Sequence, residues 1–165
     1  MGKSRVFRIG AVVAVLVFTV TIAAVSLTSA SPNDWFFRNH VRHVTIPKED
    51  RFVPFELTIH QGDTVTWINN DTDDHTVVSD SMFDSAGHKG VDMVIKGTLS
   101  NHGMPGTFSL RFTHAGSFVY YCRFHAALDS AHQPVAPGPK GGLQDAKGNF
   151  GTPMSGVIVV LDDVP

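Results

Sequence analysis

Short stretches in which apolar and polar residues alternate dominate the chain from residue 41 onward. Phe55, Leu57 and Ile59 alternate with polar neighbours, a period of two that is typical of a β-strand buried on one face. The same pattern predicts strands at residues 41–46, 64–69, 75–79, 91–95, 108–112, 118–123 and 157–161. No stretch has the period of a long amphipathic helix. We therefore expect an all-β fold, an antiparallel β-sandwich.

The N-terminal segment, residues 1–30, has a different composition. Lys3, Arg5 and Arg8 precede an apolar stretch that ends near small residues at 28–30. This order is typical of a secretory signal peptide cleaved near Ala30, but residues 9–28 are also long enough to serve as an uncleaved membrane anchor. Both alternatives place residues 31–165 outside the cytoplasm as one domain, in the periplasm, secreted, or attached to a membrane and facing outward.

The charge balance bears on the class of partner. The N-terminal segment holds three of the 13 basic residues and none of the 15 acidic ones, so residues 31–165 carry 10 basic and 15 acidic side chains. No run of Lys and Arg forms a basic stripe. A nucleic-acid partner is therefore not expected.

Cys122 is the only cysteine of the chain, so it cannot form an internal disulfide. His125 closes the run Cys122-Arg123-Phe124-His125, His75 begins a predicted strand, and Met154 precedes the last strand. A thiolate, two imidazoles and a weak axial thioether form the ligand set of a blue-copper electron-transfer site. The sequence thus predicts a mononuclear metal site.

Other readings of these side chains stay open. Zinc accepts the same donors, although copper is favoured by the general affinity order of divalent metals. A buried cysteine can also be a small apolar core residue. A catalytic nucleophile would need a base and an orienting acid, and the residues give no reason to predict an enzyme.

Several segments resemble the cupredoxins of the plastocyanin, amicyanin and pseudoazurin group. They are residues 55–71, 75–78, 83–85, 106–125 and 154–160. The resemblance implies a Greek-key β-sandwich with one type 1 (blue) copper ion. It also implies a monomeric one-electron carrier between redox proteins, with His75, Cys122, His125 and Met154 as ligands.

The chain departs from the cupredoxin pattern in its ligand loop. In that family the second histidine and the methionine lie close together in a single short loop, whereas the long segment 126–153 separates His125 from Met154 here. We interpret residues 126–153 as an insertion. It leaves His132 as an alternative axial ligand, and we expect it to lie at the docking surface beside His125 and to set the choice of partner.

Two further roles follow from the resemblance. Thr76 has the position whose backbone amide donates to the cysteine sulfur, and Tyr121 has the position that passes electrons sideways to a partner.

Other classes of copper protein do not fit these residues. Multicopper oxidases and copper nitrite reductases have a histidine at the position of Tyr121, and the binuclear copper centre of cytochrome oxidase needs two cysteines. Copper storage, delivery or sensing remains the alternative function.

Overall fold

The computed structural model describes residues 40–83, 85–138, 142–143 and 151–162. The segment predicted to be a signal peptide or anchor, residues 1–30, lies outside the described residues. Across the described ranges, no helix long and apolar enough to cross a membrane is found.

All the described regular structure is β. The strands are β1 (Val41–Ile46), β2 (Glu56–His60), β3 (Thr64–Asn69), β4 (His75–Val78), β5 (Asp92–Ile95), β6 (Gly106–Arg111), β7 (Gly116–Tyr121), β8 (Ala127–Leu128), β9 (Pro134–Val135) and β10 (Ser155–Leu161). Each strand predicted from the alternation is present. The short hairpin β8–β9 inside the insertion was not predicted.

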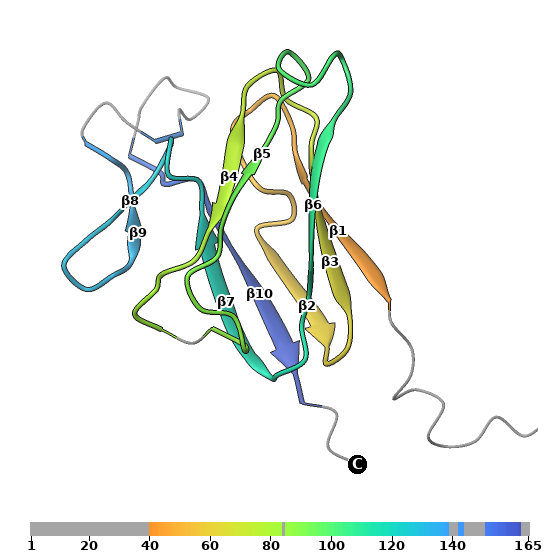
Figure 1. Ribbon diagram of the computed structural model, residues 1–165. Coiled ribbons are helices and arrows are strands. Elements are labelled where there is room, and N and C mark those ends of the chain that lie inside the picture. The colour runs from red at the N-terminus through yellow and green to blue at the C-terminus, as the bar shows by residue number, and fades with distance from the viewer. Residues whose placement is uncertain (1–39, 84, 139–141, 144–150, 163–165) are drawn as a thin grey trace, which may run out of the picture. The chain divides into compact units, whose positions relative to one another are not determined.

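Two sheets form the predicted β-sandwich (Figure 1). One has the order β1-β3-β6 and the other β2-β10-β7-β4-β5. The sheets are mixed rather than wholly antiparallel, because β1 pairs with β3 and β2 pairs with β10 in parallel. The parallel β1–β3 pair arises because β2, which runs between them along the chain, lies in the opposite sheet.

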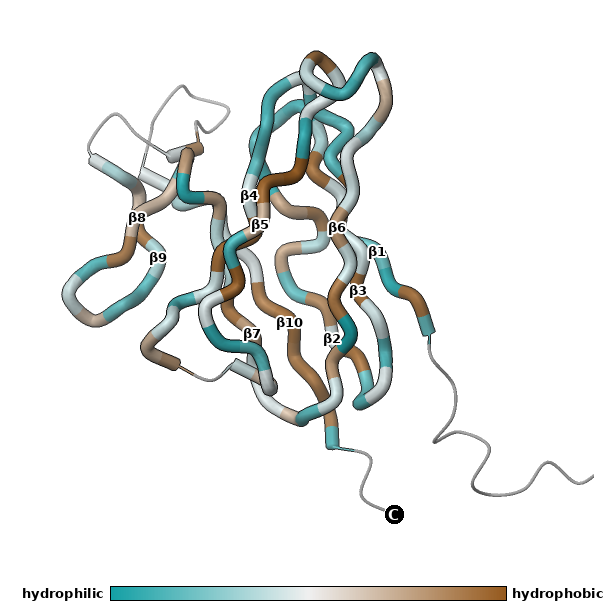
Figure 2. The backbone as a smooth tube through the Cα atoms, viewed as in Figure 1, coloured by the Kyte–Doolittle hydropathy of each residue, from teal (hydrophilic) through white to brown (hydrophobic). Residues whose placement is uncertain are grey.

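Aromatic side chains join the two sheets through the core. Trp67 on β3 contacts Tyr120 on β7 edge-on, with ring centroids 5.3 Å apart, and both are buried. Gly156 on β10 allows this packing, because a Cβ atom there would lie 2.5 Å from the Tyr120 hydroxyl. Figure 2 shows the hydrophobic residues running along β7 and β10. The end of β7, from which Cys122 follows, is therefore held in a closely packed core.

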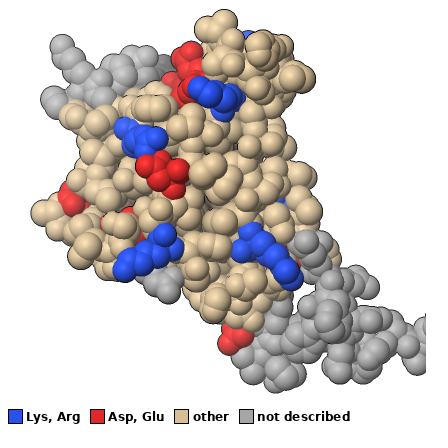
Figure 3. Space-filling model, viewed as in Figure 1, with Lys and Arg blue, Asp and Glu red and all other residues tan. Residues whose placement is uncertain are grey.

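Charged side chains are scattered rather than gathered on the face drawn in Figure 3. Lys96 pairs with Asp74 at 2.8 Å, and Arg123 pairs with Asp92. Opposite charges lie next to each other at these points. The view shows small separate basic groups and no continuous basic patch on that face.

Candidate metal site

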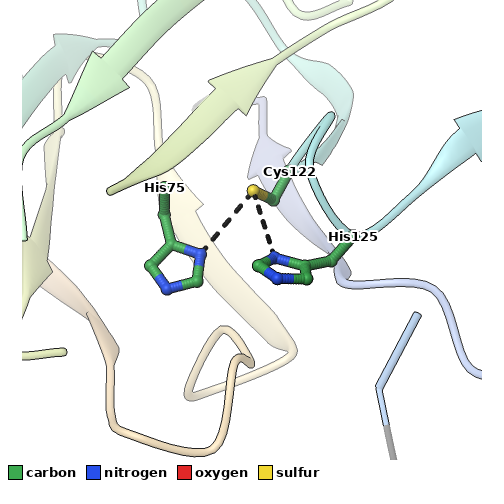
Figure 4. Close-up of side chains that lie close together, drawn as sticks. All are labelled: His75, Cys122 and His125. Carbon is green, nitrogen blue, oxygen red and sulfur yellow. Dashed lines mark hydrogen bonds between the residues drawn. The ribbon is translucent and has the colours of Figure 1, made fainter. Parts of the chain in front are cut away.

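Three side chains from two parts of the chain converge at one end of the sandwich. His75 opens β4, whereas Cys122 follows β7 directly and His125 lies in the turn after it. The amide of His125 donates to the Cys122 carbonyl at 3.0 Å, which closes that turn. In Figure 4 both imidazoles point toward the sulfur atom. The two histidines, which are distant from each other in the sequence, thus face one thiol.

The distances among the three side chains fit a single metal ion. Cys122 Sγ lies 3.6 Å from His75 Nδ1 and 3.7 Å from His125 Nδ1. An ion bonded to sulfur at about 2.3 Å and to nitrogen at about 2.0 Å, with about 120° between the bonds, holds these atoms roughly 3.7 Å apart. The three donor atoms all lie within 4.8 Å of one another. The arrangement can accept one trigonally coordinated ion with little movement of the ligands.

Protein groups stabilise the thiolate form of Cys122. Burial raises the pKa of the thiol, but hydrogen bonds from His125, His75 and the amides of Thr76 and Phe124 outweigh burial and lower the pKa to about 5. The pKa of His125 is raised, chiefly by its hydrogen bond with Cys122. A thiolate is the form of cysteine that binds metals. The negative charge of the Cys122 thiolate therefore favours the binding of a cation at this site.

Two carboxylates hold the far side of the His75 ring. Nε2 of His75 lies 3.1 Å from Asp71 Oδ2 and 3.4 Å from Asp50 Oδ1. With a carboxylate acceptor at Nε2, the ring would keep that proton when a metal ion displaces the proton of Nδ1, so Nδ1 could then serve as the ligand. Asp50 Oδ1 also lies 4.0 Å from Nε2 of His125, so this carboxylate stands at the outer edges of both rings.

These two acidic residues were not identified as part of the site from the sequence. Asp71 lies in the turn before β4, and its i, i+4 spacing to His75 is a signal that could have been read. Asp50 comes from the turn after β1, where Asp50 has a positive φ of 53°. No local pattern connects that turn with His75, so only the tertiary structure reveals the contact.

Thr76 lies next to the sulfur of Cys122. Its backbone amide donates to Cys122 Sγ at 3.4 Å, and its side-chain Oγ1 accepts a hydrogen bond from the Arg123 amide at 3.0 Å. Thr76 is buried. One residue of β4 therefore supports both Cys122 and the residue that follows it.

Met154 is buried, and its backbone lies next to the turn from Cys122 to His125. The Cys122 amide donates to the Met154 carbonyl at 2.9 Å, and the Met154 amide donates to the His125 carbonyl at 3.3 Å. The two ends of the insertion consequently meet at the site, although the whole of segment 126–153 lies between His125 and Met154 in the sequence.

His132 and Tyr121 lie in other surroundings. Nδ1 of His132 is 2.7 Å from Asp80 Oδ2, and the imidazole packs edge-on against Phe83. Among the described residues, the groups of side chains able to hold a metal do not include His132. Tyr121 ends β7 immediately before Cys122, is half-buried, and lines a cavity together with His132.

The sequence of the chain is similar to a known family and to individual proteins. The family described as copper binding proteins, plastocyanin/azurin family, matches residues 43–131. The chain is 37% identical over 75 residues to the chloroplastic plastocyanin of Chlamydomonas reinhardtii, covering 45% of this chain and half of that protein's length. It is 32% identical over 74 residues to the plastocyanin of Scenedesmus fuscus, covering 45% of this chain and 74% of that protein.

A solved cupredoxin structure is also similar to the chain. A mutant of amicyanin in the Cu(I) state has a TM-score of 0.48 and 24% identity, covering 76% of this chain and 86% of that one.

The range matched by the family contains His75, Cys122 and His125 and ends before Met154. It covers more than half of the 165 residues. The chain therefore belongs to the plastocyanin/azurin family of copper-binding proteins, the cupredoxins.

Proposed function

We propose that this protein is a type 1 copper protein that carries one electron at a time between redox proteins. The observation that carries the proposal is the convergence of two imidazole Nδ1 atoms on the Cys122 sulfur, at 3.6 and 3.7 Å. His75, Cys122 and His125 would hold one copper ion, and Met154 would supply the weak axial thioether. No catalytic activity is assigned to the chain.

The bound ion would supply the Cu(I)/Cu(II) couple, and the protein's contribution is a site that changes little between the two states. Thiolate and thioether suit Cu(I), and imidazole suits both oxidation states. His75 is oriented by Asp71, and Cys122 by the Thr76 amide. Ligands fixed in this way cannot rearrange much when the charge of the ion changes, which favours fast electron transfer.

Two exits from the site support a carrier role. The side chain of His125 is 27% exposed, so its outer edge reaches the surface. Tyr121 is bonded directly to Cys122 and borders a surface cavity. A donor and an acceptor could approach these two places in turn. We also propose that the protein works outside the cytoplasm, because residues 1–30 are typical of a signal peptide or membrane anchor.

The test is spectroscopy and electrochemistry of the copper-loaded protein. We expect an intense thiolate-to-copper charge-transfer band, the paramagnetic resonance spectrum of a type 1 site and reversible one-electron reduction. Cys122→Ser should abolish the band and keep the fold. A colourless site that releases copper readily to a chelator would overturn the carrier proposal and support storage or delivery instead.

A further inference from the structure

A cavity of about 290 Å³ lies on the outer face of β7, on the side away from the core. We call it the β7 pocket. Its walls come from β7, from the segment that follows β4 and from the hairpin of the insertion, which Figure 1 shows beside β7. The residues used in the argument are Asp80, Phe83, Val119, Tyr121, Leu128 and His132.

Most of the β7 pocket is apolar and suits one aromatic ring. Phe83 and Tyr121 supply rings, and Val119 and Leu128 supply aliphatic surface. Phe83 and Val119 are 52% and 40% exposed, although both line a concave surface. A cavity of about 150 Å³ is enough to bind benzene in another protein, so the β7 pocket has room for a substituted ring. Apolar side chains left open in a concavity are typical of a ligand site.

A defined polar group stands at one edge of the pocket. Nδ1 of His132 lies 2.7 Å from Asp80 Oδ2, while Asp80 Oδ1 accepts the Met82 amide at 2.8 Å. An ionised carboxylate only accepts hydrogen bonds, so the ring proton of neutral His132 is on Nδ1. Nε2 is then left as an acceptor. This group would pair with a hydroxyl hydrogen of a ligand.

The insertion presents His132 by means of a hydrogen-bonded turn. Asp129 Oδ1 accepts the amides of Ala131 and Gln133 at 2.8 and 2.9 Å, and the His132 amide donates to the Asp129 carbonyl at 3.0 Å. His132 itself has a left-handed backbone, with φ of 59°. Such a conformation is uncommon outside glycine and is maintained only where surrounding contacts impose it.

We propose that the β7 pocket binds a small neutral aromatic alcohol, such as a phenol or hydroquinone. The ring lies against Phe83, Val119 and Leu128, next to Tyr121, and the hydroxyl donates to His132 Nε2. Aromatic and aliphatic walls take the ring, and the oriented acceptor of His132 favours an alcohol over an ether. This inference goes beyond the proposed function, because binding requires no change in the oxidation state of the copper.

The test uses the copper-loaded full chain, reduced to Cu(I) and kept without oxygen, so that no electron transfer takes place. Phenol and its methyl ether, anisole, are titrated while amide resonances are followed by NMR. We expect saturable shifts at Ser117, Val119 and Leu128, with Ser109 on β6 unchanged. Phenol should bind with a dissociation constant of about 1 mM, the range open to a ligand of this size. Anisole should bind roughly 5-fold more weakly.

Three variants separate the parts of the proposal. His132→Asn tolerates the left-handed backbone and should reduce the affinity for phenol to that for anisole. Leu128→Trp should fill the pocket and abolish binding of both. The matched control is Val135→Trp on β9, outside the pocket, which should bind phenol like the parent protein.

The outcomes are decisive in either direction. Equal affinities for phenol and anisole in the parent protein would overturn the assignment of an alcohol. Shifts that do not saturate, or that spread over the surface, would show that the β7 pocket is not a specific binding site for phenol. Shifts at the same amides with a redox partner but none with phenol would assign the pocket to a protein side chain. If the copper-loaded protein lacks the spectrum of a type 1 site, by contrast, the proposed function is contradicted and the result on phenol binding still stands.

Discussion

The backbone amide of Thr76 donates a hydrogen bond to the sulfur of Cys122, across 3.4 Å and from a strand 46 residues away in the chain. The hydroxyl of the same threonine accepts the amide of Arg123 at 3.0 Å. The backbone of one buried residue therefore holds the cysteine sulfur, and its side chain holds the backbone of the residue that follows the cysteine.

Replacing Thr76 with valine should lower the stability of the metal-free protein. The change keeps the β-branched shape but leaves the amide of Arg123 without its acceptor. This hydrogen bond is only partly buried, so its loss should lower the free energy of unfolding by about 1 kcal/mol. Chemical denaturation measures this value. Thr76→Ser keeps the hydroxyl and is the control, and a valine variant as stable as the serine variant would contradict the role given to Oγ1.

Asp71→Asn should weaken copper binding more than Asp50→Asn. Asp71 is buried and lies 3.1 Å from His75 Nε2, whereas the Asp50 side chain is 41% exposed and 3.4 Å away. Removing an outer partner of a metal-binding histidine typically costs about 10- to 100-fold in affinity. Competition with a copper chelator gives the affinities. The opposite order would show that Asp50, which also lies near His125, is the main orienting group.

Met154→Leu should raise the reduction potential of the copper-loaded protein while the protein stays folded. Leucine conserves most of the buried volume, so the free energy of unfolding should fall by less than about 1.5 kcal/mol. The thioether is lost, and the axial ligand of a blue-copper site tunes its potential. Voltammetry measures the change. His132→Asn is the matched control: a shift there, with none in Met154→Leu, would identify His132 as the axial ligand.

The thiol of Cys122 in the metal-free protein should titrate far below its usual range. Its pKa of about 5 means that the folded protein carries the thiolate above that pH and loses it as the pH falls through that value. In denaturant the same thiol should titrate near its ordinary value of about 8.5. Ultraviolet absorbance of the thiolate follows both titrations, with Cys122→Ser as the blank. A folded-state value near the ordinary one would show that the two histidines do not stabilise the anion.

Replacing residues 126–152 with a short loop should preserve the copper spectrum and change electron-transfer rates with the native partner. The spectrum should survive because backbone hydrogen bonds already join Met154 to Cys122 and His125. The rates should change because the hairpin of the insertion borders Tyr121. Stopped-flow kinetics with the partner decides. Equal rates would remove the insertion from partner choice.

The sandwich could be predicted because its strands carry a simple local signal. Residues 55–60 and 64–69 alternate between apolar and polar side chains, and the structure has β2 and β3 there. The parallel pairing of β1 with β3 could not be predicted in the same way. It depends on which sheet β2 joins, and that is decided by packing across the core.

In the candidate site, too, the features with a local sequence signal could be predicted, and those that depend on tertiary packing could not. The spacing of Cys122 and His125 is local, and their nearness to His75 was expected from the family resemblance. Asp50 could not be found, because its contact with His75 Nε2 depends on how the turn after β1 packs against β4. The hairpin β8–β9 also has no clear signal, since each of its strands has only two residues.

The hydrogen bond between the Met154 amide and the His125 carbonyl makes the insertion a loop tied at its base. Closing a longer loop costs little extra free energy, since the entropic cost grows only with the logarithm of its length. The length of this segment can therefore change without altering the positions of the candidate metal ligands. The tied base separates the geometry of the candidate metal site from the length and the surface of the segment that the base closes.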